Sequence, residues 1–146
     1  MIEYMTLKFL QDIVVLEKEN MPEPKGELAI RTLAMPADVN PAGDIFGGWV
    51  ISQMDIAGGV TASARSHGRV ATVADTGFTF HKPVKIGDVI CCYADIQKVG
   101  NTSITIGIEA RALHRDDSKD RIKVTERVFT FVALDKDGKP RSVPPE

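Results

Sequence analysis

The sequence has few of the residues that build disulfide frameworks or metal sites. Its 146 residues include only two cysteines and three histidines. Cys91 and Cys92 are adjacent, so in a strand their side chains point to opposite faces and form neither a disulfide framework nor a metal-spaced set. The histidines, His67, His81 and His114, are too scattered to share a metal ion. We therefore expect no metal, two small buried thiols, and a reducing compartment such as the cytoplasm.

Long apolar runs and a strong charge of one sign are also missing. No stretch approaches the roughly 20 apolar residues of a membrane-spanning helix, and the N-terminus lacks the layout of a secretory signal. The net charge is −2 with no basic run, so we expect neither nucleic acid nor a membrane as a partner. An anionic ligand would need a local cluster of lysine and arginine. The length and the 43% hydrophobic content fit one domain with a real core.

Hydrophobic periodicity and turn signals divide the chain into an N-terminal arm and one domain. Residues 1–26 are predicted to form an arm or a short amphipathic helix, because apolar residues recur every three to four positions before Pro22 and Pro24. The domain is predicted to cover residues 27–146. Its expected elements are a strand at 27–34, a helix at 47–66 with Gly68 as its C-terminal cap, and strands at 70–80, 88–99, 102–114 and 121–134.

This order predicts an α+β fold, with an antiparallel five-stranded sheet wrapped around one long central helix. The short connections between the last four strands favour antiparallel pairing. Glycine, alanine and serine are frequent in the helix, which allows the sheet to approach it closely. One helix covers only part of such a sheet, and Phe129 and Phe131 add apolar surface to it. We therefore predict an obligate homo-oligomer.

Candidate chemistry is concentrated in the loop before the helix and in the first turns of the helix. Residues 35–55 read MPADVNPAGDIFGGWVISQMD. Gly47 and Gly48 open the helix, where unpaired backbone N–H groups and the helix dipole can stabilise an oxyanion. Asp55 follows two turns later on the same face, among apolar and small neighbours. Such a carboxylate can act as a base or a nucleophile.

Each of these residues also has a structural interpretation. Asp44 immediately precedes the helix, so it is either a rival catalytic carboxylate or a helix N-cap. Asn40 precedes Pro41 and could be a turn residue. Paired glycines suit any tight loop-to-helix junction, and Asp55 could be a paired structural carboxylate. The spacing between the glycines and Asp55 is what favours a catalytic site.

The motifs in residues 35–55 resemble those of the bacterial YciA-type acyl-CoA thioesterases, which have the hotdog fold. The resemblance covers about residues 27–142 and continues through the short motifs HGRV at 67–70, FHKPV at 80–84, GDV at 87–89, CCY at 91–93 and GNTS at 100–103. It implies that the protein hydrolyses acyl-CoA to a free acid and coenzyme A. It implies no cofactor besides the coenzyme A of the substrate.

The same resemblance assigns roles to the loop and helix residues. It implies that Asp55 is the general base or nucleophile, and that the N–H groups of Gly47 and Gly48 polarise the thioester carbonyl. It gives Asn40 the role of positioning water or the carbonyl. For Asp44, the position just before the helix favours a supporting role over a catalytic one. In related hotdog enzymes two subunits contribute to one site, which implies a dimer as the minimal active unit and a hexamer, three dimers, as the assembly.

The phosphates of coenzyme A require cationic or hydrogen-bonding side chains. Arg69, Lys82 and Lys98 are the candidates, because guanidinium forks and ammonium groups suit phosphate. Ser103, in the GNTS motif, is a further candidate for substrate binding.

One position departs from the pattern of some hotdog thioesterases. They carry a helper threonine one turn after the carboxylate, where this chain has Gly59. A hydroxyl that assists Asp55 would therefore have to come from elsewhere, such as Ser52 or Thr79.

Two other functions share the fold. Hotdog acyl dehydratases or hydratases resemble a pattern with a histidine beside a carboxylate, and residues 36–60 contain no histidine. A non-catalytic acyl-CoA-binding hotdog protein stays an alternative. Regulators of that kind carry a DNA-binding segment, and residues 1–26 are too short for a helix-turn-helix domain.

Overall fold

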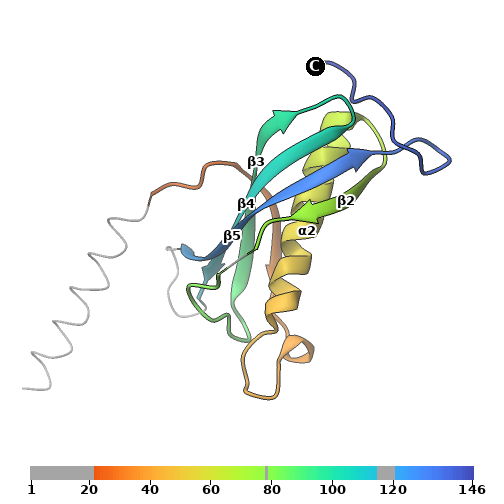
Figure 1. Ribbon diagram of the computed structural model, residues 1–146. Coiled ribbons are helices and arrows are strands. Elements are labelled where there is room, and N and C mark those ends of the chain that lie inside the picture. Colours follow the sequence, from red (N-terminus) through yellow and green to blue (C-terminus); the bar gives the residue numbers. More distant parts are fainter. Residues whose placement is uncertain (1–21, 78, 115–120) are drawn as a thin grey trace, which may run out of the picture.

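Five antiparallel strands form one sheet, and a single long helix crosses it (Figure 1). The computed structural model describes residues 22–77, 79–114 and 121–146. The helix is α2 (Gly47–Ser66), preceded by the short 3-10 helix η1 (Pro36–Asp38). The strands, in the spatial order β1-β3-β4-β5-β2, are β1 (Glu27–Leu33), β3 (Val89–Val99), β4 (Ser103–Leu113), β5 (Arg121–Ala133) and β2 (Val70–Asp75). The predicted α+β architecture is confirmed.

The helix begins and ends at the predicted residues, but its C-terminal cap is one residue earlier than predicted. His67, and not Gly68, adopts the left-handed conformation, with φ of 56°. The N–H groups of both residues donate to the carbonyl of Ser63. Because β2 starts at Val70, the chain has to leave the helix at once, and this turn reverses it directly.

β2 is five residues shorter than the predicted strand at 70–80. It ends at Asp75, and the next residue, Thr76, still donates its N–H to the carbonyl of Val128 on β5. Gly77 and then Lys82-Pro83 follow Thr76 in the sequence. Glycine and proline interrupt the regular hydrogen bonding of a strand. The segment that follows β2 therefore turns back toward the start of α2 instead of extending the sheet.

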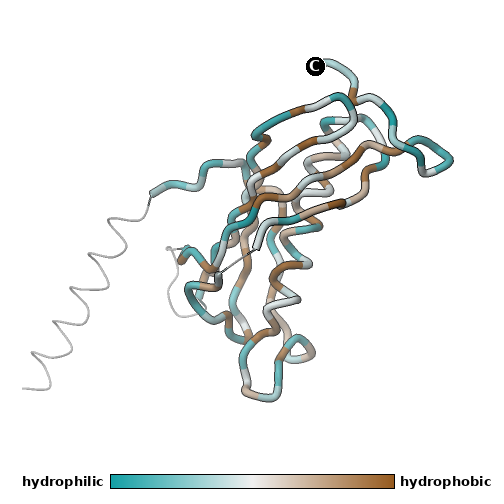
Figure 2. The backbone as a smooth tube through the Cα atoms, viewed as in Figure 1, coloured by the Kyte–Doolittle hydropathy of each residue, from teal (hydrophilic) through white to brown (hydrophobic). Residues whose placement is uncertain are grey.

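The core lies between the inner face of the sheet and α2, and the close approach depends on small helical residues. Ile104, Ile106 and Ile108 of β4 are buried, as the alternation of that strand predicts. Gly58 lies directly against the sheet: a Cβ there would be 2.5 Å from Phe131 Cζ and 2.6 Å from Ile108 Cδ1. Apolar residues recur along the inner strands and α2 in Figure 2. Glycine at position 58 therefore lowers the helix propensity but allows the sheet to pack closely against α2.

The C-terminal segment holds the last turn of α2. Arg141 donates from Nη1 to the carbonyl of Ser66 at 2.9 Å and from Nε to the carbonyl of Leu134 at 2.9 Å. Arg65 donates to the carbonyl of Pro144 at 2.6 Å. A guanidinium beside the last carbonyls of a helix satisfies unpaired acceptors and opposes the negative end of the dipole.

Both edge strands of the sheet, β1 and β2, are paired on one side only within the described residues, and each carries exposed aliphatic side chains. β2 pairs on one side only, with β5. Val73 on this strand is 58% exposed, and Ile56 on the neighbouring helix is 51% exposed. An open strand edge beside exposed aliphatic side chains favours pairing with another chain.

The remaining expectations concern the cysteines and the N-terminal arm. Cys91 and Cys92 are fully buried and free, as predicted, and burial raises the pKa of the Cys92 thiol to about 12, with a smaller effect from Cys91. Most of the predicted arm at 1–26 lies outside the described residues, which begin at Pro22. Within the described residues, every helix falls short of the length and hydropathy that a membrane-spanning helix requires.

Candidate functional site

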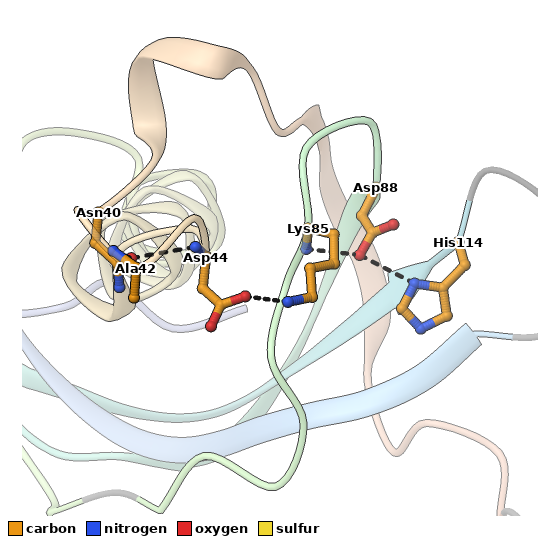
Figure 3. Close-up of polar contacts among 6 residues, drawn as sticks. All are labelled: Asn40, Ala42, Asp44, Lys85, Asp88 and His114. Carbon is orange, nitrogen blue, oxygen red and sulfur yellow. Dashed lines mark hydrogen bonds and ion pairs between the residues drawn. The ribbon is translucent and has the colours of Figure 1, made fainter.

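The loop before α2 is ordered by Asn40. Its Oδ1 accepts hydrogen bonds from the N–H groups of Ala42 at 2.9 Å and Asp44 at 3.1 Å (Figure 3). Its backbone also pairs with Asp44, and Gly43 takes a φ of 89°, which favours glycine. The interpretation of Asn40 as a turn residue is therefore confirmed. With Oδ1 occupied, its amide NH2 is the part that stays available to a ligand.

Asp44 does not cap α2. The N-cap residue is Phe46, and no side chain caps it. The Asp44 carboxylate instead forms an ion pair with Lys85, which lies in the connection before β3. The predicted N-cap role of Asp44 is wrong, because the chain between Asp44 and the helix turns its carboxylate toward that connection.

The connection that carries Lys85 is held by a buried carboxylate (Figure 3). Asp88, which is 3% exposed, accepts from Lys85 N–H at 2.9 Å, and its Oδ2 is 3.0 Å from His114 Nδ1. The carbonyl of Val84 in the same connection accepts the N–H of Ile45 at 3.0 Å. Together these contacts tie the start of α2 to the end of β4.

The first turn of α2 presents free donors. Among the described residues, the N–H groups of Gly47 and Gly48 have no hydrogen-bond acceptor. A Cβ at Gly47 would be 2.8 Å from Phe80 Cε2, whereas one at Gly48 would meet no atom within 4 Å. The exposed Gly48 therefore leaves its amide open to a ligand, and Gly47 is in contact with an aromatic ring.

Asp55 is half-buried on α2, and its partner is a threonine that the sequence did not indicate. Thr72 on β2 donates from Oγ1 to Asp55 Oδ1 at 2.5 Å. Ser52, one of the two hydroxyls proposed from the sequence, donates instead to the carbonyl of Trp49 at 2.7 Å. The hydroxyl lies seventeen residues after the carboxylate. A neighbouring strand, and not the next turn of the helix, therefore supplies it.

In one chain the glycines and Asp55 lie about two helical turns apart. Gly48 and Asp55 are separated by seven residues of α2, which is about 10 Å along the axis. An oxyanion and the proton of an attacking water each need a partner at roughly 3 Å. The two parts of the predicted site therefore lie on one helix, about two turns apart.

The predicted substrate-binding residues form two groups. Arg69 and Ser103 lie at one end of the sheet, since the carbonyl of Arg69 accepts the N–H of Leu134 and Ser103 pairs with Val132. Lys98 pairs with Thr105 near that end.

Lys82 lies at the other end, next to the first turn of α2. Its neighbour His81 donates its N–H to the carbonyl of Val124. Val124 and Leu134 are ten residues apart along β5 and its extension, which is roughly 30 Å. Within one chain, the four residues therefore cannot contact one phosphate group.

A cavity of about 250 Å³ opens beside the start of α2. Its lining residues come from the loop before the helix, the helix itself and the connection after β2; they are Asp44, Ile45, Gly47, Val50, Phe80, His81, Lys82, Pro83 and Val84. In the described ranges, no group of three or more histidine, cysteine, aspartate or glutamate side chains is placed to hold a metal ion.

Comparison with known proteins identifies the family. Residues 42–118 match the thioesterase superfamily. The chain is 54% identical over 123 residues to the acyl-CoA thioester hydrolase YciA of Salmonella typhimurium, covering 83% of this chain and 92% of the relative. The chain therefore belongs to the thioesterase superfamily. Within it, the chain belongs with the YciA acyl-CoA thioester hydrolases.

Solved structures agree with this assignment. The hexameric broad-specificity acyl-coenzyme A thioesterase HI0827 is 47% identical, with a TM-score of 0.82 and 88% coverage of each chain. A hexameric hotdog-fold thioesterase of Campylobacter jejuni is 40% identical, with a TM-score of 0.77, covering 84% of this chain and 93% of that one. The protein has the hotdog fold, as the sequence predicted.

A more distant structure bears on the carboxylate and hydroxyl pair. An acyl-CoA hydrolase of Staphylococcus aureus is 28% identical, with a TM-score of 0.70, over 79% of this chain and 70% of that one. Its solved forms include alanine mutants of an aspartate and of a threonine seventeen residues further on. Asp55 and Thr72 have the same separation.

Proposed function

We propose that the protein hydrolyses the thioester of acyl-CoA, giving a free carboxylic acid and coenzyme A. Membership of the superfamily and the activity of the relatives support this reaction. The local observation that supports it best is the pairing of a threonine hydroxyl with the half-buried carboxylate on α2, at 2.5 Å. No cofactor takes part, because ester and thioester hydrolysis needs only water, a base and an oxyanion site.

The reacting centre is shared by two protomers. The separation of roughly 10 Å between Gly48 and Asp55 along one helix supports a site that is completed by a second chain. The two protomers make a two-fold contact through the open β2 edge, where Val73 and Ile56 are exposed. This contact places the two α2 helices side by side, so that the first turn of one helix lies next to the middle of the other. The dimer is then the minimal active unit, with two sites.

The N–H groups of Gly47 and Gly48 of one protomer bind the thioester oxygen as negative charge develops on it. Asp55 of the other protomer takes a proton from the attacking water, or attacks the carbonyl carbon itself and forms an anhydride that water then opens. In both versions the thiolate of coenzyme A leaves and is protonated. Thr72 holds the carboxylate in one orientation, and Asn40 donates from its amide to the attacking water or the carbonyl.

Coenzyme A is bound by cationic and hydrogen-bonding side chains from both ends of the sheet. Lys82 lies beside the helix start of the protomer that polarises the carbonyl. Arg69, Lys98 and Ser103 lie at the opposite end of each chain. Two protomers in a two-fold arrangement bring one end near the other, so the phosphates are met by residues of both chains. We place three such dimers in a hexamer, since two related thioesterases are hexameric, and we place the protein in the cytoplasm.

Substitution of Asp55 tests the reaction. Asp55→Asn and Asp55→Ala are expected to lower kcat by several orders of magnitude, while the oligomer and the unfolding temperature are unchanged. Release of free thiol from a panel of acyl-CoA substrates measures the rate. Near-wild-type turnover in either variant would remove Asp55 from the mechanism.

Gly48 offers a matched pair of variants for the oxyanion site. Gly48→Pro deletes the N–H group at a position in the first helical turn, where proline is tolerated. Gly48→Ala keeps the N–H, and its Cβ meets no described atom within 4 Å. Loss of one oxyanion donor costs roughly 100- to 1000-fold in kcat. We expect this loss for proline and not for alanine; equal effects of the two would contradict the role of the amide.

A further inference from the structure

A buried arginine lies on the face of β5 that packs against α2. Arg127 is 7% exposed, and it precedes Phe129 and Phe131 at alternate positions along the strand. Both phenylalanines are buried in the core, and Phe131 lies against Gly58 of the helix. The guanidinium carbon of Arg127 is 6.0 Å from the centre of the Phe129 ring. Since alternate residues of a strand share a face, Arg127 points to the helix side of the sheet.

Arg127 binds the chain at the point where β2 ends. Its Nη2 atom is 3.5 Å from Asp75 Oδ1, which makes an ion pair with the last residue of that strand. Its Nε atom donates to the carbonyl of Thr76 at 3.2 Å. Thr76 is also joined to Val128 by two hydrogen bonds, of 3.0 and 3.1 Å. A buried guanidinium that is held by both a carboxylate and a carbonyl fixes the position of this strand end.

The pairing of β2 with β5 contains a bulge beside Thr72. In a regular strand, residues three positions apart point to opposite faces. Thr72 and Asp75, which are three positions apart, instead lie opposite two alternate residues of β5, Phe131 and Phe129. The register shifts at Val73, so both side chains point to the same face, toward α2. The bulge therefore lets β2 present both the hydroxyl that binds Asp55 and the carboxylate that binds Arg127.

We propose that Arg127 is a positioning residue: by holding Asp75 it keeps the bulge in register, and it thereby keeps the Thr72 hydroxyl on Asp55. The inference rests on the proposed thioesterase function and on the role of Thr72 in it. Without the ion pair, β2 is an edge strand that can slip by one residue, and such a slip turns side chains to the opposite face. The hydroxyl of Thr72 then leaves the carboxylate. In this role Arg127 contacts no reacting atom and acts through Thr72.

A double-mutant cycle on kcat tests this coupling. Arg127→Met removes the charge and keeps an unbranched side chain. It should lower kcat about tenfold with KM nearly unchanged, because misplacement of a catalytic group by about 1 Å has effects of this order or larger. In the Thr72→Val background the same substitution should change kcat by less than about twofold, since the hydroxyl that it positions is already absent. Release of free thiol from acyl-CoA measures the rates, and size-exclusion chromatography verifies the oligomer.

Two further variants make the test selective. Asp75→Asn removes the charge of the partner, whose side chain is 38% exposed. It should give the same pattern, and it decides the matter if Arg127→Met does not fold or loses the oligomer. Arg111→Met is the control, because Arg111 is equally buried, at 6% exposed, and forms an ion pair with Glu109 at 2.8 Å.

The control differs from Arg127 in the face on which it lies. Arg111 follows Ala110 and precedes Ala112, which are both in the core, so its side chain points away from α2. Arg111→Met should lower the unfolding temperature because it leaves a buried carboxylate without its partner. Its kcat should stay within about twofold of wild type, since Arg111 does not act through Thr72.

The results separate this inference from the proposed function. A loss of kcat in Arg127→Met or Asp75→Asn that persists in full in the Thr72→Val background would overturn the positioning role. Wild-type kcat in both variants, or an equal loss in Arg111→Met, would overturn it as well. If Thr72→Val itself keeps wild-type kcat, the role of Thr72 is wrong, and this inference falls with it. If the wild-type protein hydrolyses no acyl-CoA, the thioesterase assignment is wrong.

Discussion

The hydrogen bond between Thr72 and Asp55 gives the most informative single substitution. Thr72→Val keeps the size and branching of the side chain and deletes the hydroxyl that donates to Asp55 Oδ1 at 2.5 Å. Hydrogen bonds to charged groups contribute roughly 1.5–3 kcal/mol. If the bond orients the carboxylate for attack, its loss should lower kcat by about ten- to a hundredfold, at 1.36 kcal/mol per factor of ten.

The assay is steady-state release of free thiol from acyl-CoA, with kcat and KM determined separately. Thr72→Ser keeps the hydroxyl and is expected to retain most of the wild-type kcat. Because Thr72 lies on the open edge strand β2, the oligomeric state of both variants has to be verified by size-exclusion chromatography. Wild-type kcat in Thr72→Val, or equal losses in the valine and serine variants with the oligomer intact, would refute the positioning role.

Four further predictions concern stability and thiol chemistry. Gly58→Ala should lower the free energy of unfolding by about 1–3 kcal/mol through overpacking, and calorimetry should show a melting temperature several degrees lower. Gly59→Ala is the control: a Cβ there would have its nearest neighbour at 4.0 Å, so this substitution should not destabilise the fold. Arg141→Gln removes the guanidinium from the last turn of α2, and urea titration should show a loss of about 1–3 kcal/mol; an unchanged midpoint would contradict this. Cys91 and Cys92 should resist an aromatic disulfide reagent in the native state and both react in urea. Because burial raises the pKa of Cys92 from 9.0 to about 12, its contribution to stability is complete below pH 9 and is lost as the pH rises toward 12; a Cys92→Ala control that follows the wild-type pH dependence would exclude this.

The fold was largely predictable because its periodic signals are strong. The alternation in β4 and the glycine-bounded helix gave bounds within one or two residues of those observed. The errors lie where tertiary contacts decide the local conformation. β2 stops at Asp75 because the following segment has to return to the start of α2. His67 takes the left-handed position because the chain has to reach Val70 directly.

The site was predictable only in part, for a geometric reason. Gly47, Gly48 and Asp55 are close in sequence on one helix, so helical spacing places them relative to one another. Thr72 is remote in sequence and reaches Asp55 only through the contact of β2 with α2. The one sequence signal that could have indicated Thr72 is its position in an edge strand directly after the helix. The partner of Asp44, Lys85, likewise depends on how two loops meet.

Complementation between two inactive variants tests the shared site most directly. Asp55→Ala and Gly48→Pro are each expected to be nearly inactive as pure proteins. In a heterodimer of the two, one site combines the intact glycines of one chain with the intact carboxylate of the other. Equal co-expression makes about half of the dimers mixed, so activity should return to about a quarter of wild type. Activity no higher than that of the pure variants, in oligomers shown to contain both chains, would contradict a site built from two protomers.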